Sequence, residues 1–86
     1  MVLTKLVKLE WNIERTDEMY LAAQAVNDRF VAESKADGVW EKNPDADWGG
    51  QWKLVDQAAA EEYIAVITAV GIANGRTLVS SSITDI

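Results

Sequence analysis

The stretch GVWEKNPDADWGGQWKLVDQAAAEEY, residues 38–63, decides the fold. Pro44 has no amide proton to donate to a sheet, and Gly49-Gly50 suits a turn, so residues 43–50 predict a connection between two strands. Asp56 then offers a side-chain oxygen to the free amides of a new helix. The stretch therefore predicts strand, turn, strand and helix, with at least one of the two glycines at positive φ.

The segment before this stretch predicts a helix. Thr16 can accept a hydrogen bond from the first free amides, and acidic residues follow it where the helix dipole favours negative charge. Apolar side chains then recur at helical spacing, at Met19, Ala23, Val26 and Phe30. Glycine takes the left-handed conformation that ends many helices, so Asp37-Gly38 predicts the end of a helix over residues 17–36.

The remaining segments complete the order of elements. Helical spacing continues after Asp56 and should end at Gly71 or at Asn74-Gly75, and residues 77–84 then predict a last strand. Residues 2–12 predict the first strand. The order β-α-β-β-α-β predicts an α+β, ferredoxin-like fold over a single domain, residues 1–86, with two helices on one face of a four-stranded antiparallel sheet.

The first and last strands carry apolar residues on both faces, according to their alternation. In residues 2–12, Leu6 falls on the face opposite to Val7 and Leu9. A sheet with apolar side chains on both faces is usually covered on both. We therefore expect a second copy of the chain to cover the face that the helices leave open, which makes a homodimer.

Charge and composition exclude several classes of partner and site. A net charge of −6 argues against nucleic acid and anionic membrane as partners, because both require a cationic surface. The chain has no cysteine and no apolar run approaching the length of a membrane span, which predicts a cytoplasmic protein. It also has no histidine, no metal-binding motif and no set of catalytic residues with a recognisable spacing, so we expect no metal site.

The runs VWEKNP (39–44) and AAAEEY (58–63), with Gly49-Gly50 after an acidic turn, resemble the YdhR-type monooxygenase family of the dimeric α+β barrel superfamily. The resemblance covers residues 36–65 well. It implies a homodimer whose two sheets face each other, forming a dimeric α+β barrel, with a small cavity between sheet and helices in each protomer. It also implies oxidation of a small aromatic compound by oxygen without a metal, a flavin or any other cofactor. Because this chain has no histidine, mechanisms that need an imidazole do not apply to it.

Aromatic side chains on the strands and on the inner faces of the helices are the candidate ligand-binding residues. They are Trp40, Trp11, Trp52, Tyr20 and Tyr63. Each also has a structural interpretation, because buried aromatic residues more often pack a core or an interface than line a pocket. Arg15, Arg29 and Arg76 are expected at the surface, and Trp48 is expected either in solvent or against a partner.

Two functional hypotheses follow. The first is an enzyme that resembles the cofactor-independent monooxygenases and acts on a small aromatic compound. The second is a non-catalytic module that binds a small hydrophobic molecule or serves as a structural dimerisation domain. The missing histidine favours the second hypothesis, and the family resemblance favours the first.

Overall fold

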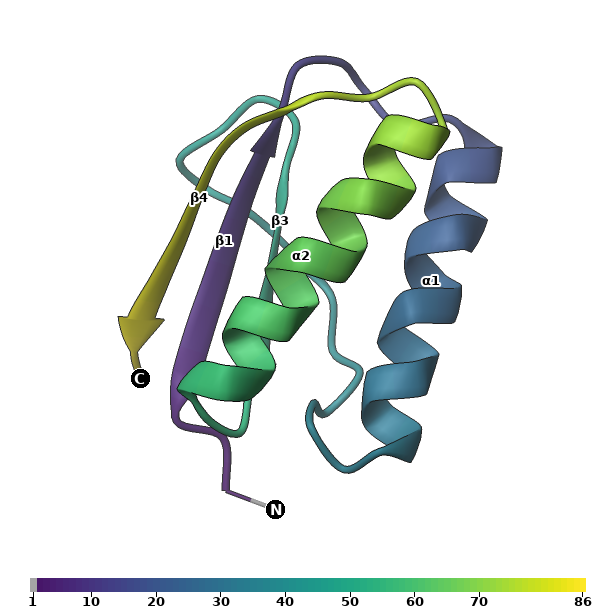
Figure 1. Cartoon of the computed structure of the whole chain (residues 1–86). Coiled ribbons are helices and arrows are strands. Elements are labelled where there is room, and N and C mark those ends of the chain that lie inside the picture. The colour runs from purple at the N-terminus through teal and green to yellow at the C-terminus, as the bar shows by residue number, and fades with distance from the viewer. Residues whose placement is uncertain (1) are drawn as a thin grey trace.

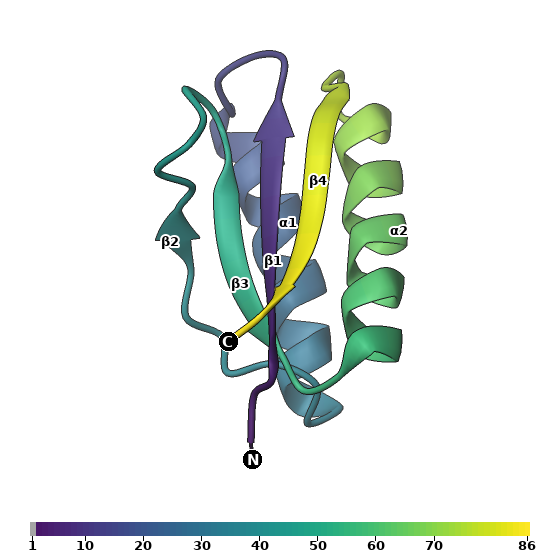
Figure 2. The same ribbon diagram turned by 90° about the vertical axis from the view of Figure 1, so that its left-hand side faces the viewer.

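The computed structural model describes residues 2–86 and contains six elements in the predicted order (Figure 1). They are β1 (Lys5–Trp11), α1 (Asp17–Ala32), β2 (Glu41–Lys42), β3 (Gly50–Leu54), α2 (Gln57–Ala73) and β4 (Leu78–Asp85). The sheet has the order β2-β3-β1-β4, and every neighbouring pair is antiparallel. Both helices lie on one side of the sheet, which Figure 2 shows from its open side. The ferredoxin-like α+β prediction is confirmed.

The core fills the space between the sheet and the two helices. On β1, Val7, Leu9 and Trp11 alternate toward the helices and are buried. Trp52 and Leu54 do the same on β3. The helices contribute Val26, Phe30, Ala59, Ala60, Tyr63 and Ile67. No helix in the described part of the chain is long and apolar enough to cross a membrane.

The prediction of an apolar second sheet face is wrong. In the register of β1 with β4, Val7 stands opposite Ile83, so Ile83 lies on the inner face. A shift in that register between Glu10 and Trp11 brings Leu78 opposite Trp11, which places Leu78 inside as well. The outer positions of β1, β3 and β4 are then mostly polar: Leu6, Lys8, Glu10, Gln51, Lys53, Ser80, Ser82 and Thr84. This face is of the kind that antiparallel sheets commonly expose to water.

Side-chain caps fix the start of each helix as predicted. The Thr16 hydroxyl accepts the Met19 amide at 3.3 Å, and the Asp56 carboxylate accepts the Ala59 amide at 2.8 Å. The second helix ends at Ala73 and is capped by Asn74, followed by Gly75 at φ 87°, which selects one of the two predicted ends. Each cap satisfies an amide that has no partner inside its own helix.

The predicted end of the first helix is wrong. The helix ends at Ala32, and Ser34 rather than a glycine takes the left-handed conformation, with φ 58°. The Lys35 amide then donates to the Phe30 carbonyl at 2.8 Å, which satisfies one of the last carbonyls. The chain has to leave the helix here because Ala36 forms a bridge with Leu54 of β3.

The turn between β2 and β3 forms, but its glycines are not at positive φ as predicted. The glycines at positive φ in the described chain are Gly38 and Gly75. A Cβ on Gly49 would instead collide with the carbonyl oxygen of Leu9, so the residue is small for lack of space. Asn43 starts the turn: its side chain accepts the Asp45 amide at 2.9 Å and donates to the Leu9 carbonyl at 2.9 Å.

Candidate functional site

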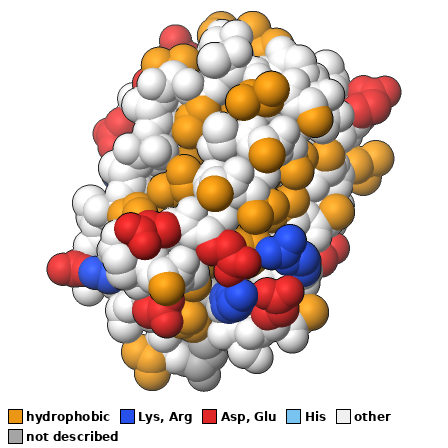
Figure 3. Space-filling view, in the orientation of Figure 1, with side chains coloured by type: hydrophobic (Ala, Val, Ile, Leu, Met, Phe, Trp, Pro, Cys, Tyr) orange, Lys and Arg blue, Asp and Glu red, His pale blue; other side chains and the backbone are white. Residues whose placement is uncertain are grey.

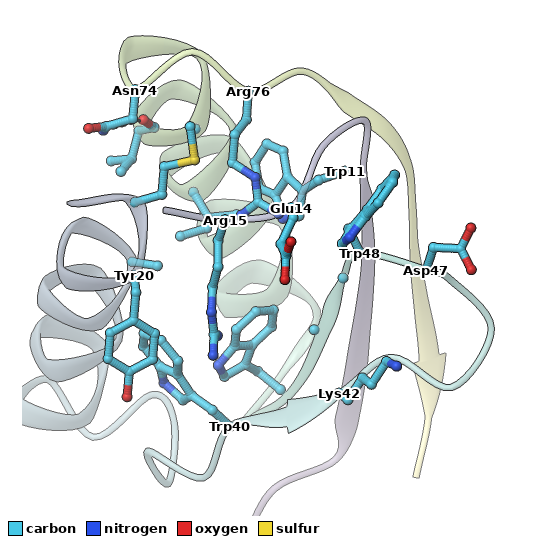
Figure 4. A pocket seen from close by; sticks show the side chains of 18 of the residues that line it. Trp11, Glu14, Arg15, Tyr20, Trp40, Lys42, Asp47, Trp48, Asn74 and Arg76 are labelled. Atoms are coloured by element: carbon cyan, nitrogen blue, oxygen red, sulfur yellow. Dashed lines mark hydrogen bonds between the residues drawn. The ribbon is translucent and has the colours of Figure 1, made fainter. Parts of the chain in front are cut away.

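A pocket of about 490 Å³ opens between the inner face of the sheet, the start of α1 and the end of α2 (Figure 4). We call it the aromatic pocket after the rings in its lining, which are Trp11, Tyr20, Trp40, Trp48 and Trp52. The lining residues come from both layers of the fold. Because α1 starts at the end of the molecule where α2 finishes, the two antiparallel helices bring these distant segments together (Figure 1).

The rings of the pocket continue into the core in a series of ring contacts. Three of them are edge-on, and the contact between Trp52 and Tyr63 is tilted at 47°. Tyr20 meets Trp40 with ring centroids 5.3 Å apart and planes at 69°. Trp40 meets Trp52 at 5.7 Å and 80°. Behind them, Trp52 contacts Tyr63 at 5.5 Å, and Tyr63 contacts Phe30 at 5.1 Å. Edge-to-face pairs at such distances are favourable beyond the area that they bury, so the series holds the pocket wall in place.

The structure brings together four of the five candidate residues. Trp11, Tyr20, Trp40 and Trp52 all line the aromatic pocket. Tyr63 does not, because it is fully buried behind Trp52. Burial raises the pKa of the Tyr63 phenol far above its usual value, and its hydroxyl has no hydrogen-bond partner within residues 2–86. Tyr63 therefore supports the wall of the pocket without reaching its space.

Trp11 owes its position to a glycine on the facing helix. A Cβ on Gly71 would collide with the six-membered ring of the Trp11 indole. Gly71 lies inside α2, where glycine costs on the order of 1 kcal/mol of helix stability relative to alanine. Its backbone is approached closely by Trp11, which explains why a glycine stands within this helix. The sequence offered Gly71 as a possible helix end, and the structure gives it this packing role instead.

Two arginines that were expected at the surface line the pocket. Arg15 is exposed, as expected, and Arg76 is half-buried. The Arg15 guanidinium lies over the ring of Tyr20, 4.5 Å from its centroid, and that of Arg76 lies over Trp11 at 4.7 Å. Arg76 also donates to the Ile13 carbonyl at 3.0 Å. Burial, and secondarily the charge of Arg15, lower the pKa of the Arg76 guanidinium. Arg15 precedes the cap at the start of α1, and Arg76 follows the end of α2. These positions were the features of the sequence from which their place in the pocket could have been predicted.

Three acidic residues also border the pocket, in different ways. Glu14 reaches into the same space as Arg15 in Figure 4, whereas Asp47 points away from it. Glu41 accepts a hydrogen bond from Gln51 at 2.9 Å, and Gln51 is on the outer face of the sheet. Glu14 is thus the carboxylate best placed to act on a bound molecule. Within residues 2–86, no three acidic side chains come close enough together to hold a metal ion.

Trp48 and Lys42 complete the open side of the pocket. Trp48 lies in the turn before β3 and is exposed, and its backbone carbonyl accepts the Trp11 amide at 2.7 Å. Its ring lies at the edge of the pocket. Lys42 also borders the pocket, but Figure 4 shows its side chain directed away from the rings.

Comparison with known proteins identifies no relative of this chain. The resemblance of residues 36–65 to the YdhR-type family therefore stays a prediction. No family model matches the chain, and no match was found among curated proteins or solved structures.

Proposed function

We propose that this protein binds a small planar aromatic compound in the aromatic pocket. The observation that carries the proposal is the pocket of about 490 Å³ with indole and phenol rings from β1, β3, α1 and the loop before β2 in its lining. Ligand sites for small molecules are commonly concave, lined by aromatic side chains and between roughly 300 and 1,000 Å³ in volume. Because the rings of the lining stand at steep angles to one another, a flat aromatic molecule can stack on one ring and make an edge-to-face contact with another.

The test of this function is calorimetric titration with flat bicyclic aromatic compounds, in wild type and in Trp40→Ala. Trp40 is half-buried and contacts both Tyr20 and Trp52, so its removal should take away one wall of the pocket. We expect affinity to fall about tenfold or more, which corresponds to roughly 1.4 kcal/mol.

Tyr63→Phe is the matched control, because Tyr63 lies behind the pocket and does not line it. Its affinity should equal that of the wild type. If Trp40→Ala binds as tightly as wild type while remaining folded, the ligand lies elsewhere. If none of the compounds binds the wild type, the pocket does not have the proposed function.

A second candidate is oxidation of a bound phenol by oxygen without a cofactor, as the family resemblance implies. Its support in the pocket is Glu14, whose carboxylate can accept the phenolic proton and so make the bound ring easier to oxidise. Oxygen consumption with phenolic compounds tests this candidate, with Glu14→Gln as the variant that cannot accept the proton. Binding without oxygen consumption would leave the non-catalytic function alone.

We also propose that the chain forms a homodimer. β4 lies at an edge of the sheet and extends over Leu78–Asp85, so one row of its backbone groups has no neighbouring strand in the described chain. An exposed strand edge of this length is a template for pairing with another strand. A second copy can supply that strand, because two antiparallel copies of β4 form a symmetric pair.

A further inference from the structure

The distribution of ion pairs separates the aromatic pocket from the rest of the surface. The chain has 8 lysines and arginines against 14 acidic residues, so carboxylates are in excess. Four of these cations form ion pairs, namely Lys5, Lys8, Arg29 and Lys35. Within residues 2–86, the cations without an ion pair are Arg15, Lys42, Lys53 and Arg76. All of them except Lys53 border the aromatic pocket.

At the opposite end of the helices, cations are paired with carboxylates. There Arg29 and Lys35 contact Glu33 and Glu62 at 2.8–3.4 Å. Figure 3 shows blue and red side chains side by side in the lower part of the face that the helices form. The two arginines of the pocket have no such neutralising partners. Of the charged side chains that border the pocket in the described chain, Glu14 is the one carboxylate that shares its space with these two arginines.

Arg76 is held firmly but is incompletely satisfied. Its guanidinium is stacked on Trp11 and bonded to the Ile13 carbonyl, which fixes its position. Its Nε atom is nevertheless buried, and no hydrogen-bond partner for it is found within the described chain. A buried donor without an acceptor is costly, and an anion beside the guanidinium groups would reduce the repulsion between Arg76 and Arg15.

We propose that the ligand of the aromatic pocket is an aromatic carboxylate, whose ring lies among the tryptophans and whose negative charge Arg15 and Arg76 balance. This inference rests on the function proposed above for the pocket. Guanidinium groups are suited to the role because they stack on aromatic rings and donate to carboxylates from a planar edge. Glu14 opposes the same charge, so it should weaken the binding of an acid and set an upper limit on affinity.

The test compares an aromatic acid with its neutral amide. 2-Naphthoate and 2-naphthamide have the same ring system, and at pH 7 they differ in charge. Calorimetric titration of the wild type should show the acid binding about tenfold or more tightly than the amide. Because this preference is a ratio measured on one protein, a loss of folded protein does not alter it.

Three variants assign the preference to named residues. Arg15→Gln should lower the affinity for the acid about tenfold while changing that for the amide less than twofold. Lys53→Gln removes the same charge from the outer face of the sheet and should leave both affinities unchanged. Glu14→Gln should raise the affinity for the acid and leave the affinity for the amide unchanged.

The outcomes distinguish the inference from the function on which it rests. If the amide binds as tightly as the acid, the pocket binds aromatic compounds but the assignment of an anion is wrong. If Lys53→Gln weakens the acid as much as Arg15→Gln does, net charge and not the pocket explains the preference, and the assignment is again wrong. If neither compound binds, the proposed function fails together with this inference.

Discussion

In Tyr63 the ring stabilises the core, whereas the buried hydroxyl destabilises it. The ring packs edge-on against Phe30 at 5.1 Å and supports Trp52 from behind. The hydroxyl, however, is buried and has no partner among the described residues. Burial raises the pKa of this phenol, because the phenolate would lie in an apolar environment. A role for Tyr63 as a desolvated phenol in catalysis is therefore not supported by its position.

Tyr63→Phe should leave the protein at least as stable as wild type at pH 7, because a buried hydroxyl without a partner costs about 1–3 kcal/mol. The effect depends on pH. An unfolded tyrosine loses its proton near pH 10, whereas the folded protein keeps this proton to higher pH. The stability of wild type is therefore complete below about pH 10 and falls above it, and this part of the fall should be absent from the variant.

Urea denaturation at pH 7 and at several values between about 9 and 11 measures this difference. Tyr20→Phe, which removes the hydroxyl of an exposed tyrosine, is the control. A wild type and a Tyr63→Phe variant with parallel stability curves above pH 10 would mean that the phenol titrates normally in the folded state.

The aromatic part of the site could be predicted from local patterns, and the charged part could not. Trp11 and Trp52 follow the alternation of their strands toward the helices, so their side of the sheet was predictable. Arg15 and Arg76 are separated by most of the chain and lie next to helix ends. Both arginines line the pocket because α1 and α2 are antiparallel, so the start of α1 lies beside the end of α2. The residues next to Arg15 or Arg76 in the sequence do not predict this arrangement.

The hairpin of β2 and β3 depends on close approach between its turn and the neighbouring strand. The Trp11 amide donates to the Trp48 carbonyl at 2.7 Å, and Asn43 donates to the Leu9 carbonyl at 2.9 Å. Gly49 stands between these two contacts, against the Leu9 carbonyl oxygen. The turn is thus docked on β1 through backbone groups, which cannot move aside as a flexible side chain could.

Gly49→Ala should destabilise the protein by about 1–3 kcal/mol, because its methyl group meets backbone atoms of Leu9 and forces the turn away from β1. Thermal or chemical unfolding measures the loss. Asp47→Ala, in the same turn but exposed, should stay within about 0.5 kcal/mol of wild type. Equal stability of both variants would show that the turn is not packed on β1 as described.

At the scale of elements, the sequence predicts what local chemistry determines. Thr16 and Asp56 start their helices because the cap lies within three residues of the amide that it satisfies. The end of α1 was predicted too late because the chain leaves the helix to join β3, through the bridge of Ala36 with Leu54. The outer face was predicted wrongly because the sides of β4 depend on its register with β1, including the shift near Trp11.

The two sides of the sheet differ in character. The outer face of the sheet carries charged and hydroxyl side chains, whereas the space between sheet and helices is lined by aromatic rings. The reason first given for a dimer, an apolar outer face, therefore does not hold. The open edge of β4 is the feature that supports pairing instead.

Light scattering after size exclusion at low micromolar concentration should give twice the chain mass of 9.5 kDa. A standard interface removes about 800 Å² from each partner, and the isolated chain exposes 4847 Å². Ser81→Pro should favour the monomer, because proline blocks pairing along an edge strand. Gly49→Ala serves here as a control for general destabilisation. A monomeric mass for the wild type would contradict the dimer.

The pair formed by Trp40 and Trp52 has an optical consequence. Two indoles with centroids 5.7 Å apart and planes at 80° are close enough for their excited states to mix. Such mixing gives circular dichroism with paired bands of opposite sign, a signal that neither indole gives alone. Both rings line the pocket, but Trp40 is half-buried and Trp52 is buried, so a small rotation of Trp40 would change this signal without any change in the fold. If the proposed ligand turns Trp40 when it binds, circular dichroism of this pair would report the binding.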